Sequence, residues 1–198
     1  MVEAVLARRP DSRLARQAED LIRAVQPLFL TNHAFRSHFL AVALADRDQI
    51  GFDTELLYVA SLLHDVGLVE EFDTGACFEE DGAAAATRLA SLEGWPPERA
   101  DALAEAIRLH VATNVELGDG AEAFLLWHST ALDVGGDRHG DVRAATVSAV
   151  LAAYPRLDFK EGFTELIADQ AKRKPGCWAA TAMRNGLAQR IAAAPFES

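Results

Sequence analysis

Cysteine is scarce in this chain: only Cys77 and Cys177 occur among its 198 residues. They form no CxxC pair and fit no zinc-finger spacing, so a cysteine-based metal site is excluded. Disulfides are rare in cytosolic proteins, and we therefore expect both side chains to be reduced thiols. Cys77 stands beside Phe78 without a basic neighbour, which argues against a thiol nucleophile.

Basic residues are also few. Lysine and arginine number 19 against 30 aspartates and glutamates, which gives a formal net charge of −11. Binding to a phosphate backbone requires a basic surface, so we expect no nucleic-acid partner. A phosphorylated small molecule stays compatible with this charge, because a bound metal ion reverses the local field.

Long apolar runs are missing as well. No segment approaches the roughly 18 uninterrupted apolar residues of a membrane-spanning helix. Residues 1–20, MVEAVLARRPDSRLARQAED, alternate charged and apolar groups and lack the apolar core of a signal peptide. We therefore expect no membrane partner and a cytoplasmic protein.

Alternating strand patterns, internal repeats and low-complexity linkers are absent too, whereas helical periodicity is frequent. Apolar residues recur at three- and four-residue steps, and capping residues, prolines and glycines mark the ends of the periodic segments. These patterns predict one all-α domain over residues 1–198, a bundle of eight or nine helices. The predicted helices cover residues 12–30, 31–51, 53–67, 79–95, 96–113, 121–136, 139–153, 160–173 and 178–193, with a loop at 68–78.

The pair His64–Asp65 follows the apolar run YVASLL and precedes Gly67. Neighbours on a helix point about 100° apart, but at a helix end both side chains can face a cation in the groove between helices. An imidazole nitrogen and a carboxylate oxygen suit a divalent metal. The alternative is that Asp65 only orients His64, or that the pair caps the helix end.

Asp133 occupies a similar place in TALDVGG, at the glycine-marked end of another apolar helix. A buried carboxylate is costly without a cation or a donor, and a site shared with His64–Asp65 removes that cost. The alternative is an exposed aspartate in a last helical turn. His33 lies near the predicted start of a helix, where a surface histidine close to the cap is the simpler interpretation.

The order His33, His64–Asp65, Asp133 resembles the H…HD…D signature of the HD superfamily of metal-dependent hydrolases. Further blocks are similar to its cyanamide-hydratase-like branch. They are NHAFRS at 32–37, ASLLHDVGL at 60–68, FEEDGA at 78–83, AIRLH at 106–110 and LDVGG at 132–136. These blocks form a motif core over about residues 31–136, followed by C-terminal helices over 139–193. The resemblance implies an all-helical fold in which His33, His64, Asp65 and Asp133 hold a metal ion.

The expected cofactor is one divalent metal ion. Two imidazoles with carboxylates favour zinc, and iron, manganese, nickel and cobalt are alternatives. A second ion would require His110 and His128. His128 lies five residues before Asp133, which places the two side chains about 140° apart on a regular helix. We therefore expect a mononuclear site.

Glu79 and Glu80 open a helix, where negative charge is favourable without any further role. The resemblance places this block at the pocket, so Glu79 becomes a candidate for proton transfer together with Asp65. Glu80 is the neighbouring alternative and a candidate for contacting substrate.

Other candidates for substrate binding are His110, His128 and Arg36. We expect His110 to hydrogen-bond substrate or water, and His128 to lie beside it or in the core behind it. Arg36 shares a helix face with His33, where it either pairs with an anion or carboxylate near the metal or is an ordinary surface residue. We expect His38 and His139 to face solvent.

The leading hypothesis is an enzyme that uses a metal ion to activate water towards a small-molecule substrate. The resemblance implies hydration of a nitrile-like carbon, cyanamide giving urea. The alternative is a phosphohydrolase acting on a nucleotide or small phosphoester, but cations near the motifs are few: Arg36, Arg88 and Arg108. A di-iron oxygen-activating enzyme and a non-catalytic binding module are further alternatives.

A homo-oligomer is the remaining expectation. The last predicted helices carry Trp178, Met183 and Leu187 outside the motif core, and exposure of these side chains would favour self-association. Internal packing is the alternative.

Overall fold

Helices account for all the regular structure between residues 5 and 196, the part of the chain that the computed structural model describes. The all-α prediction is therefore confirmed. The α-helices are α2 (Arg13–Val25), α3 (Leu28–Asp48), α4 (Thr54–Leu63), α5 (Phe78–Leu92), α6 (Pro97–Leu109), α7 (Ala121–Gly135), α8 (Ala144–Ala153), α9 (Phe159–Arg173), α10 (Trp178–Arg184) and α11 (Leu187–Ala192). Short 3-10 turns lie at Val66–Leu68, Glu70–Phe72, Leu117–Asp119 and His139–Asp141.

Capping residues and prolines explain where the first helices begin and end. The Ser12 side chain accepts a hydrogen bond from the backbone of Ala15 and opens α2. Pro27 separates α2 from α3, because a proline cannot donate within a helix. Helix α3 begins directly after Pro27, earlier than the predicted start at residue 31.

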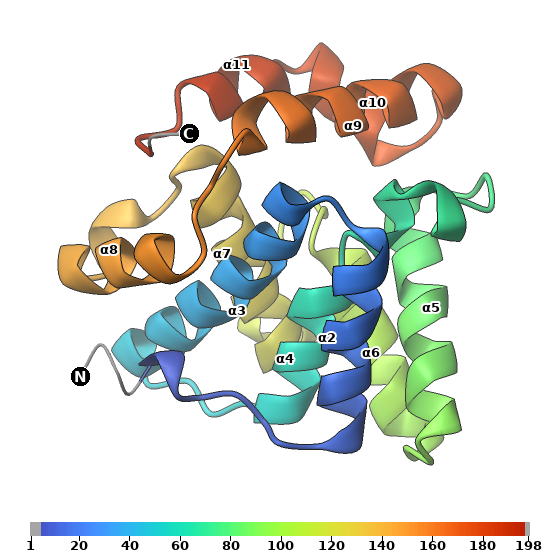
Figure 1. Ribbon diagram of the computed structural model, residues 1–198, viewed down its shortest axis with the longest axis vertical. Coiled ribbons are helices and arrows are strands. Elements are labelled where there is room, and N and C mark those ends of the chain that lie inside the picture. Colours follow the sequence, from blue (N-terminus) through green and yellow to red (C-terminus); the bar gives the residue numbers. More distant parts are fainter. Residues whose placement is uncertain (1–4, 197–198) are drawn as a thin grey trace.

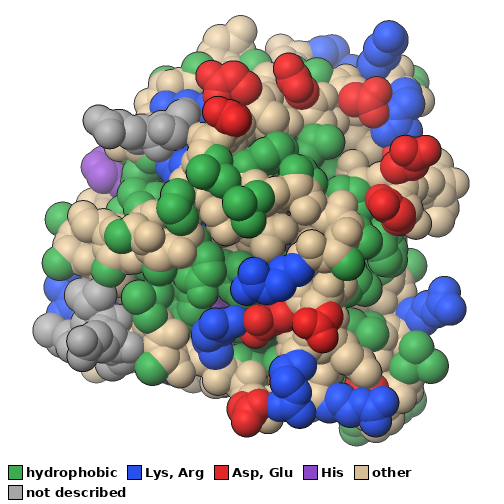
Figure 2. Space-filling model, viewed as in Figure 1, with side chains coloured by type: hydrophobic (Ala, Val, Ile, Leu, Met, Phe, Trp, Pro, Cys, Tyr) green, Lys and Arg blue, Asp and Glu red, His purple; other side chains and the backbone are tan. Residues whose placement is uncertain are grey.

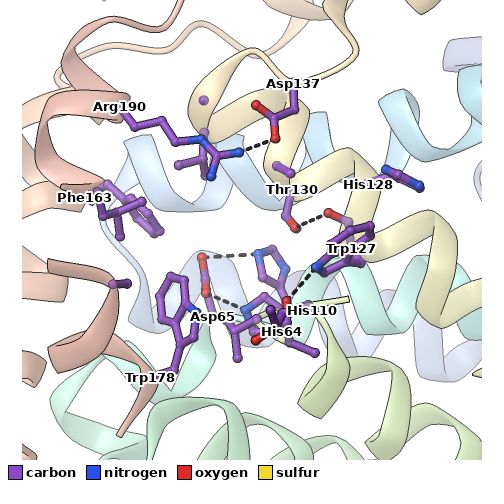
Figure 3. A pocket seen from close by; sticks show the side chains of 18 of the residues that line it. His64, Asp65, His110, Trp127, His128, Thr130, Asp137, Phe163, Trp178 and Arg190 are labelled. Atoms are coloured by element: carbon purple, nitrogen blue, oxygen red, sulfur yellow. Dashed lines mark hydrogen bonds and ion pairs between the residues drawn. The ribbon is translucent and has the colours of Figure 1, made fainter. Parts of the chain in front are cut away.

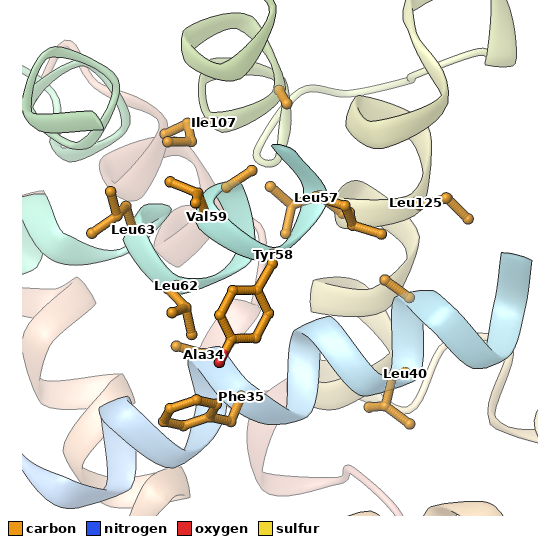
Figure 4. Close-up of a cluster of buried hydrophobic side chains, with 14 of the residues drawn as sticks. Ala34, Phe35, Leu40, Leu57, Tyr58, Val59, Leu62, Leu63, Ile107 and Leu125 are labelled. Carbon is orange, nitrogen blue, oxygen red and sulfur yellow. The ribbon is translucent and has the colours of Figure 1, made fainter. Parts of the chain in front are cut away.

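The centre of the molecule is α4, which α2, α3, α6 and α7 surround (Figure 1). All residues from Leu56 to Leu63 are buried, and so is the middle of α3 from Leu30 to Val42. Figure 4 shows Leu62, Leu63 and Tyr58 of α4 pointing in different directions into the core. A helix buried on all sides is apolar all round. Because α4 is buried from Leu56 to its end, the residues that follow its last turn also lie in the interior. This is how α4 brings His64 to the middle of the protein.

The last three helices, α9 to α11, lie together across one end of the molecule (Figure 1). The predicted helix over 178–193 is wrong as a single element, because Gly186 adopts a left-handed conformation with φ of 88° and separates α10 from α11. Leu187 is buried, and Trp178 and Met183 pack against the core. The apolar side chains that suggested a homo-oligomer therefore pack against the core of the chain itself. Self-association stays a prediction.

A disulfide joins Cys77 to Cys177, with 5.5 Å between their Cα atoms. The expectation of two reduced thiols is wrong. Each cysteine immediately precedes a helix, α5 or α10, and the fold brings these two helix starts together. Sequence spacing gave no sign of this contact, because it forms only when α10 covers the beginning of α5.

On the face shown in Figure 2, charged side chains lie mainly towards the upper and lower edges, with apolar groups between them, and no continuous basic surface is present on that face. None of the described helices is both long and apolar enough to cross a bilayer.

Candidate metal centre

Helix α4 ends at Leu63, and the chain then turns sharply through His64 and Asp65 into the 3-10 turn Val66–Leu68. Gly67 is necessary for this turn: a Cβ atom there would lie 2.2 Å from the carbonyl oxygen of Phe78. The turn thus packs directly on the start of α5. As a result His64 and Asp65 leave the helix inside the protein, with exposed fractions of 1% and 2%.

Hydrogen bonds at the outer ring nitrogens fix the orientation of both site imidazoles. The Nδ1 atom of His64 lies 2.8 Å from the carbonyl oxygen of Ser61, to which it donates. The Nδ1 atom of His33, on α3, lies 2.7 Å from Oδ2 of Asp133, and it donates to that carboxylate. In a neutral imidazole the other nitrogen is then an acceptor. Both Nε2 atoms therefore present lone pairs to the centre of the site.

Three acceptor atoms meet at this centre. The Nε2 atoms of His33 and His64 are 3.2 Å apart, and Oδ2 of Asp65 lies 3.5 Å from the first and 3.2 Å from the second. This oxygen is buried without a hydrogen-bond partner. Ligands about 2.0 to 2.1 Å from a tetrahedral zinc ion are separated by roughly 3.3 Å. The three side chains therefore fit a divalent metal ion of this size.

The charges of the site also favour a cation. Burial alone would raise the pKa of Asp65, but the imidazoles of His64 and His110 hold that pKa well below its usual range. Burial would lower the pKa of His64, yet the neighbouring Asp65 carboxylate raises it. Burial lowers the pKa of His33, although Asp133 opposes this. The site thus contains an ionised carboxylate that attracts positive charge to the space between the rings.

Asp133 lies directly behind His33, and both of its oxygens are occupied. Arg36 donates to Oδ1 and Oδ2 at 2.8 Å each. Arg156 donates to Oδ1 at 3.0 Å and to the carbonyl oxygen of Asp133 at 2.9 Å. Burial would raise the pKa of Asp133, but Arg36 and His33 hold it well below the usual range. In this arrangement Asp133 orients His33, and direct coordination by Asp133 stays a prediction.

Two buried arginines neutralise Asp133, and the sequence pointed to only one of them. Arg36 is fully buried, so the surface interpretation is wrong; it is a carboxylate partner, as the other interpretation held. It does not line the pocket. Arg156 was missed, because it lies outside the motif core and follows Pro155 in a segment without any recognisable pattern.

His110 lies on the other side of Asp65. Its Nδ1 atom donates to the carbonyl oxygen of Ile107, so Nε2 is an acceptor that faces Oδ1 of Asp65 at 3.6 Å. Burial raises the pKa of Glu79, and the nearby His110 opposes this shift. The Oε2 atom of Glu79 is buried without a partner. Glu79 therefore lies within electrostatic reach of His110, but it does not line the pocket.

Glu80 and His128 lie farther from the centre. Glu80 is exposed and pairs with Arg108 at 2.8 Å. His128 lines the pocket, with its ring against Phe124 and Trp127. Among the described residues, the group that could hold a metal ion consists of His33, His64 and Asp65, and His128 is not part of it.

Of the two histidines expected in solvent, only His139 is exposed. The expectation for His38 is wrong. Its side chain is fully buried beside the ring of Tyr58, with Nε2 2.8 Å from the carbonyl oxygen of Arg8. Helix α3 is buried on all sides in this region. The capping residues that predicted a helix here gave no indication of that burial.

A cavity of about 650 Å³ opens over the centre. Figure 3 shows Asp65, His64 and His110 between Trp178 and Phe163 on one side and Trp127 on the other, with Arg190 and Asp137 beyond them. The site therefore communicates with a space that can hold a substrate.

Comparison with known proteins agrees with this geometry. Residues 30–131 match the HD domain family. The chain is 29% identical over 172 residues to cyanamide hydratase DDI2 and to cyanamide hydratase DDI3 of Saccharomyces cerevisiae (strain ATCC 204508 / S288c), covering 84% of this chain and 76% of each relative. The predicted resemblance to the HD superfamily and to its cyanamide-hydratase-like branch is confirmed.

Proposed function

Because the chain belongs to the HD domain family, we propose that it is a metal-dependent enzyme that hydrates a small nitrile-like substrate, with cyanamide and urea as substrate and product. The supporting observation is the convergence of three buried acceptors, His33 Nε2, His64 Nε2 and Asp65 Oδ2, without a donor between them. Zinc is the metal that this set favours. The curated relatives are named as cyanamide hydratases, which supports the choice of substrate.

A divalent ion held by His33, His64 and Asp65 supplies Lewis acidity and lowers the pKa of bound water. The chain supplies orientation and proton transfer. Water adds across the carbon–nitrogen triple bond, so that oxygen bonds to carbon and one proton passes to the nitrile nitrogen. The isourea formed in this way becomes urea when its hydroxyl proton moves to the same nitrogen. We assign the first transfer to Nε2 of His110, an acceptor beside Asp65, which takes the proton from the attacking water and delivers it to the nitrile nitrogen. The carboxyl group of Glu79 is the next carrier.

The pocket favours an uncharged substrate over a phosphoester. Arg36 is committed to Asp133, and Arg108 to Glu80. The arginines that do line the pocket, Arg138 and Arg190, are paired with aspartates. A phosphoryl group would have to compete with these carboxylates for its contacts.

The test is an assay of the purified protein for urea release from cyanamide with Zn²⁺, Mn²⁺, Fe²⁺ or Co²⁺, with nucleoside monophosphates assayed in parallel. We expect about one metal ion per chain and formation of urea. Asp65→Ala should lose both the metal and turnover. Asp101→Asn, which changes an exposed carboxylate of α6, should lose neither. Phosphate release without urea, or full metal content and activity in Asp65→Ala, would refute the proposal.

A further inference from the structure

The cavity above the metal centre is much larger than cyanamide requires. Its volume is about 650 Å³. Cyanamide is hardly larger than two water molecules, each of which takes about 30 Å³ in the liquid. Pockets of roughly 300 to 1,000 Å³ typically enclose ligands with many more atoms. Most of this space is therefore available to a part of the substrate that does not react.

The side chains around the extra space are mainly apolar. Val111, Ala131 and Val134 line it from the α6 end and from α7, and Ala182 and Leu187 line it from α10 and α11. Of the charged side chains, Arg190 and Asp137 pair with each other and are about half exposed. Arg138 is paired with Asp48 and Asp141. Charge thus lies towards the solvent side of the cavity, and apolar surface lies nearer the metal centre (Figure 3).

Three aromatic rings flank the metal centre, and a separate contact fixes each of them. The indole nitrogen of Trp127 donates to the carbonyl oxygen of Ala112 at 2.9 Å. Phe163 stacks on Phe159 with 4.9 Å between ring centroids. Trp178 follows the disulfide-bonded Cys177 and contacts the ring of Phe78. Rings held in this way are ordered before a ligand arrives, which lowers the entropic cost of binding.

We propose that the substrate of this enzyme is a monosubstituted cyanamide or nitrile whose substituent is flat and apolar, and that Trp178, Phe163 and Trp127 bind this substituent. The reacting group in this inference rests on the proposed function. The substituent is inferred from the size and lining of the cavity. N-phenylcyanamide is the simplest compound with both parts. Water adds to its nitrile carbon as in cyanamide, and N-phenylurea is the product.

The experiment compares kcat/KM for N-phenylcyanamide and cyanamide with the metal-loaded full chain. We expect the aryl compound to be favoured at least tenfold, since burial of even one methylene group in an apolar pocket changes selectivity about tenfold or more. Trp178→Ala should reduce this ratio by about tenfold. Ala182→Leu, which fills part of the cavity without removing a core contact, should reduce it in the same direction. Trp95→Ala is the matched control, because Trp95 packs against Arg99 outside the pocket.

Binding of N-phenylurea to the metal-free chain, measured by calorimetry, separates this inference from the proposed function. Binding that Trp178→Ala weakens supports the aromatic subsite even if no cyanamide is hydrated. Hydration of cyanamide, without preference for the aryl compound and without binding of N-phenylurea, would overturn the inference and leave the proposed function standing. Absence of both turnover and binding would overturn both.

Discussion

The carboxylate of Asp133 combines two tasks, since it accepts a hydrogen bond from His33 and neutralises Arg36 and Arg156. Asn at position 133 leaves one uncharged accepting oxygen for His33, Arg36 and Arg156, so His33 is held less firmly. We expect Asp133→Asn to lower zinc affinity by about 10- to 100-fold, as a weakened hydrogen bond behind a ligand does. It should also cost about 3 to 5 kcal/mol of folding stability, because two buried guanidinium groups lose their counter-charge. Chelator competition and urea denaturation measure the two effects.

The control for this variant is Asp101→Asn, which changes the net charge equally but at an exposed position of α6. Unchanged zinc affinity in Asp133→Asn would contradict the role assigned to Asp133.

His38 is remote from the pocket and provides a test of stability against pH. Burial and the nearby arginines Arg8 and Arg9 lower its pKa to about 4, although its bond to the Arg8 carbonyl opposes this. The unfolded chain binds the proton near pH 6.5. Stability is therefore complete above this pH and falls as the pH drops from about 6.5 towards 4, by up to roughly 3 kcal/mol.

Removing the imidazole by His38→Gln should reduce this dependence. Denaturation curves at pH 7.5, 5.5 and 4.5 measure the slope for both proteins. An identical slope in wild type and His38→Gln would show that His38 does not cause it.

Several site residues could be predicted from local patterns, and others could not. His64, Asp65 and Asp133 stand at glycine-marked ends of apolar helices, where a polar side chain has no packing role. His33 carries no such local sign, and only the resemblance pointed to it. Arg156 reaches the site through the folding back of the segment before α9 onto α7, and its one sequence neighbour of note, Pro155, indicates only a break. Contacts made by tertiary folding leave no periodic trace in the sequence.

At the scale of elements, the connection between α4 and α5 determines where the metal ligands lie. Gly67→Ala would place a Cβ atom 2.2 Å from the backbone oxygen of Phe78 and 2.9 Å from the Asp81 side chain. Because a backbone atom cannot move aside easily, the turn must shift and take Asp65 with it. We expect a metal affinity at least tenfold lower and a loss of about 1 to 3 kcal/mol in stability.

Gly51→Ala is the matched control for Gly67→Ala, since nothing lies within 4 Å of a Cβ atom at that position. Equal metal affinities in Gly67→Ala, Gly51→Ala and the wild type would rule out this dependence on close packing.

Element boundaries show the same division between local and tertiary causes. Helix α2 ends just before Pro27, and α7 ends at the pair Gly135–Gly136. Both are strong local signals for a helix end. The break between α10 and α11 at Gly186 was missed, since an isolated glycine within an apolar periodic segment is often tolerated in a helix. Packing of both short helices over the pocket favours the break.

For the molecule as a whole, the Cys77–Cys177 disulfide connects the motif core to the C-terminal helices that complete the pocket. The two cysteines are 100 residues apart, and closing a loop of that length stabilises a folded chain by about 2 to 5 kcal/mol through restriction of the unfolded state. Cys177→Ser should therefore lower the free energy of unfolding by this amount. Trp178 is next to Cys177 in the chain, and without the disulfide its ring is held less firmly. The preference for an aryl substrate should therefore also decline.

The double variant Cys77→Ser, Cys177→Ser isolates the covalent bond from the thiols. Dithiothreitol should lower the urea midpoint of the wild type towards that of the double variant, and it should leave the double variant unchanged. A thiol assay of the denatured, unreduced wild type should detect no free cysteine. Two free thiols per chain, or a wild-type midpoint indifferent to reductant, would show that the C-terminal helices are held over the metal centre by packing alone.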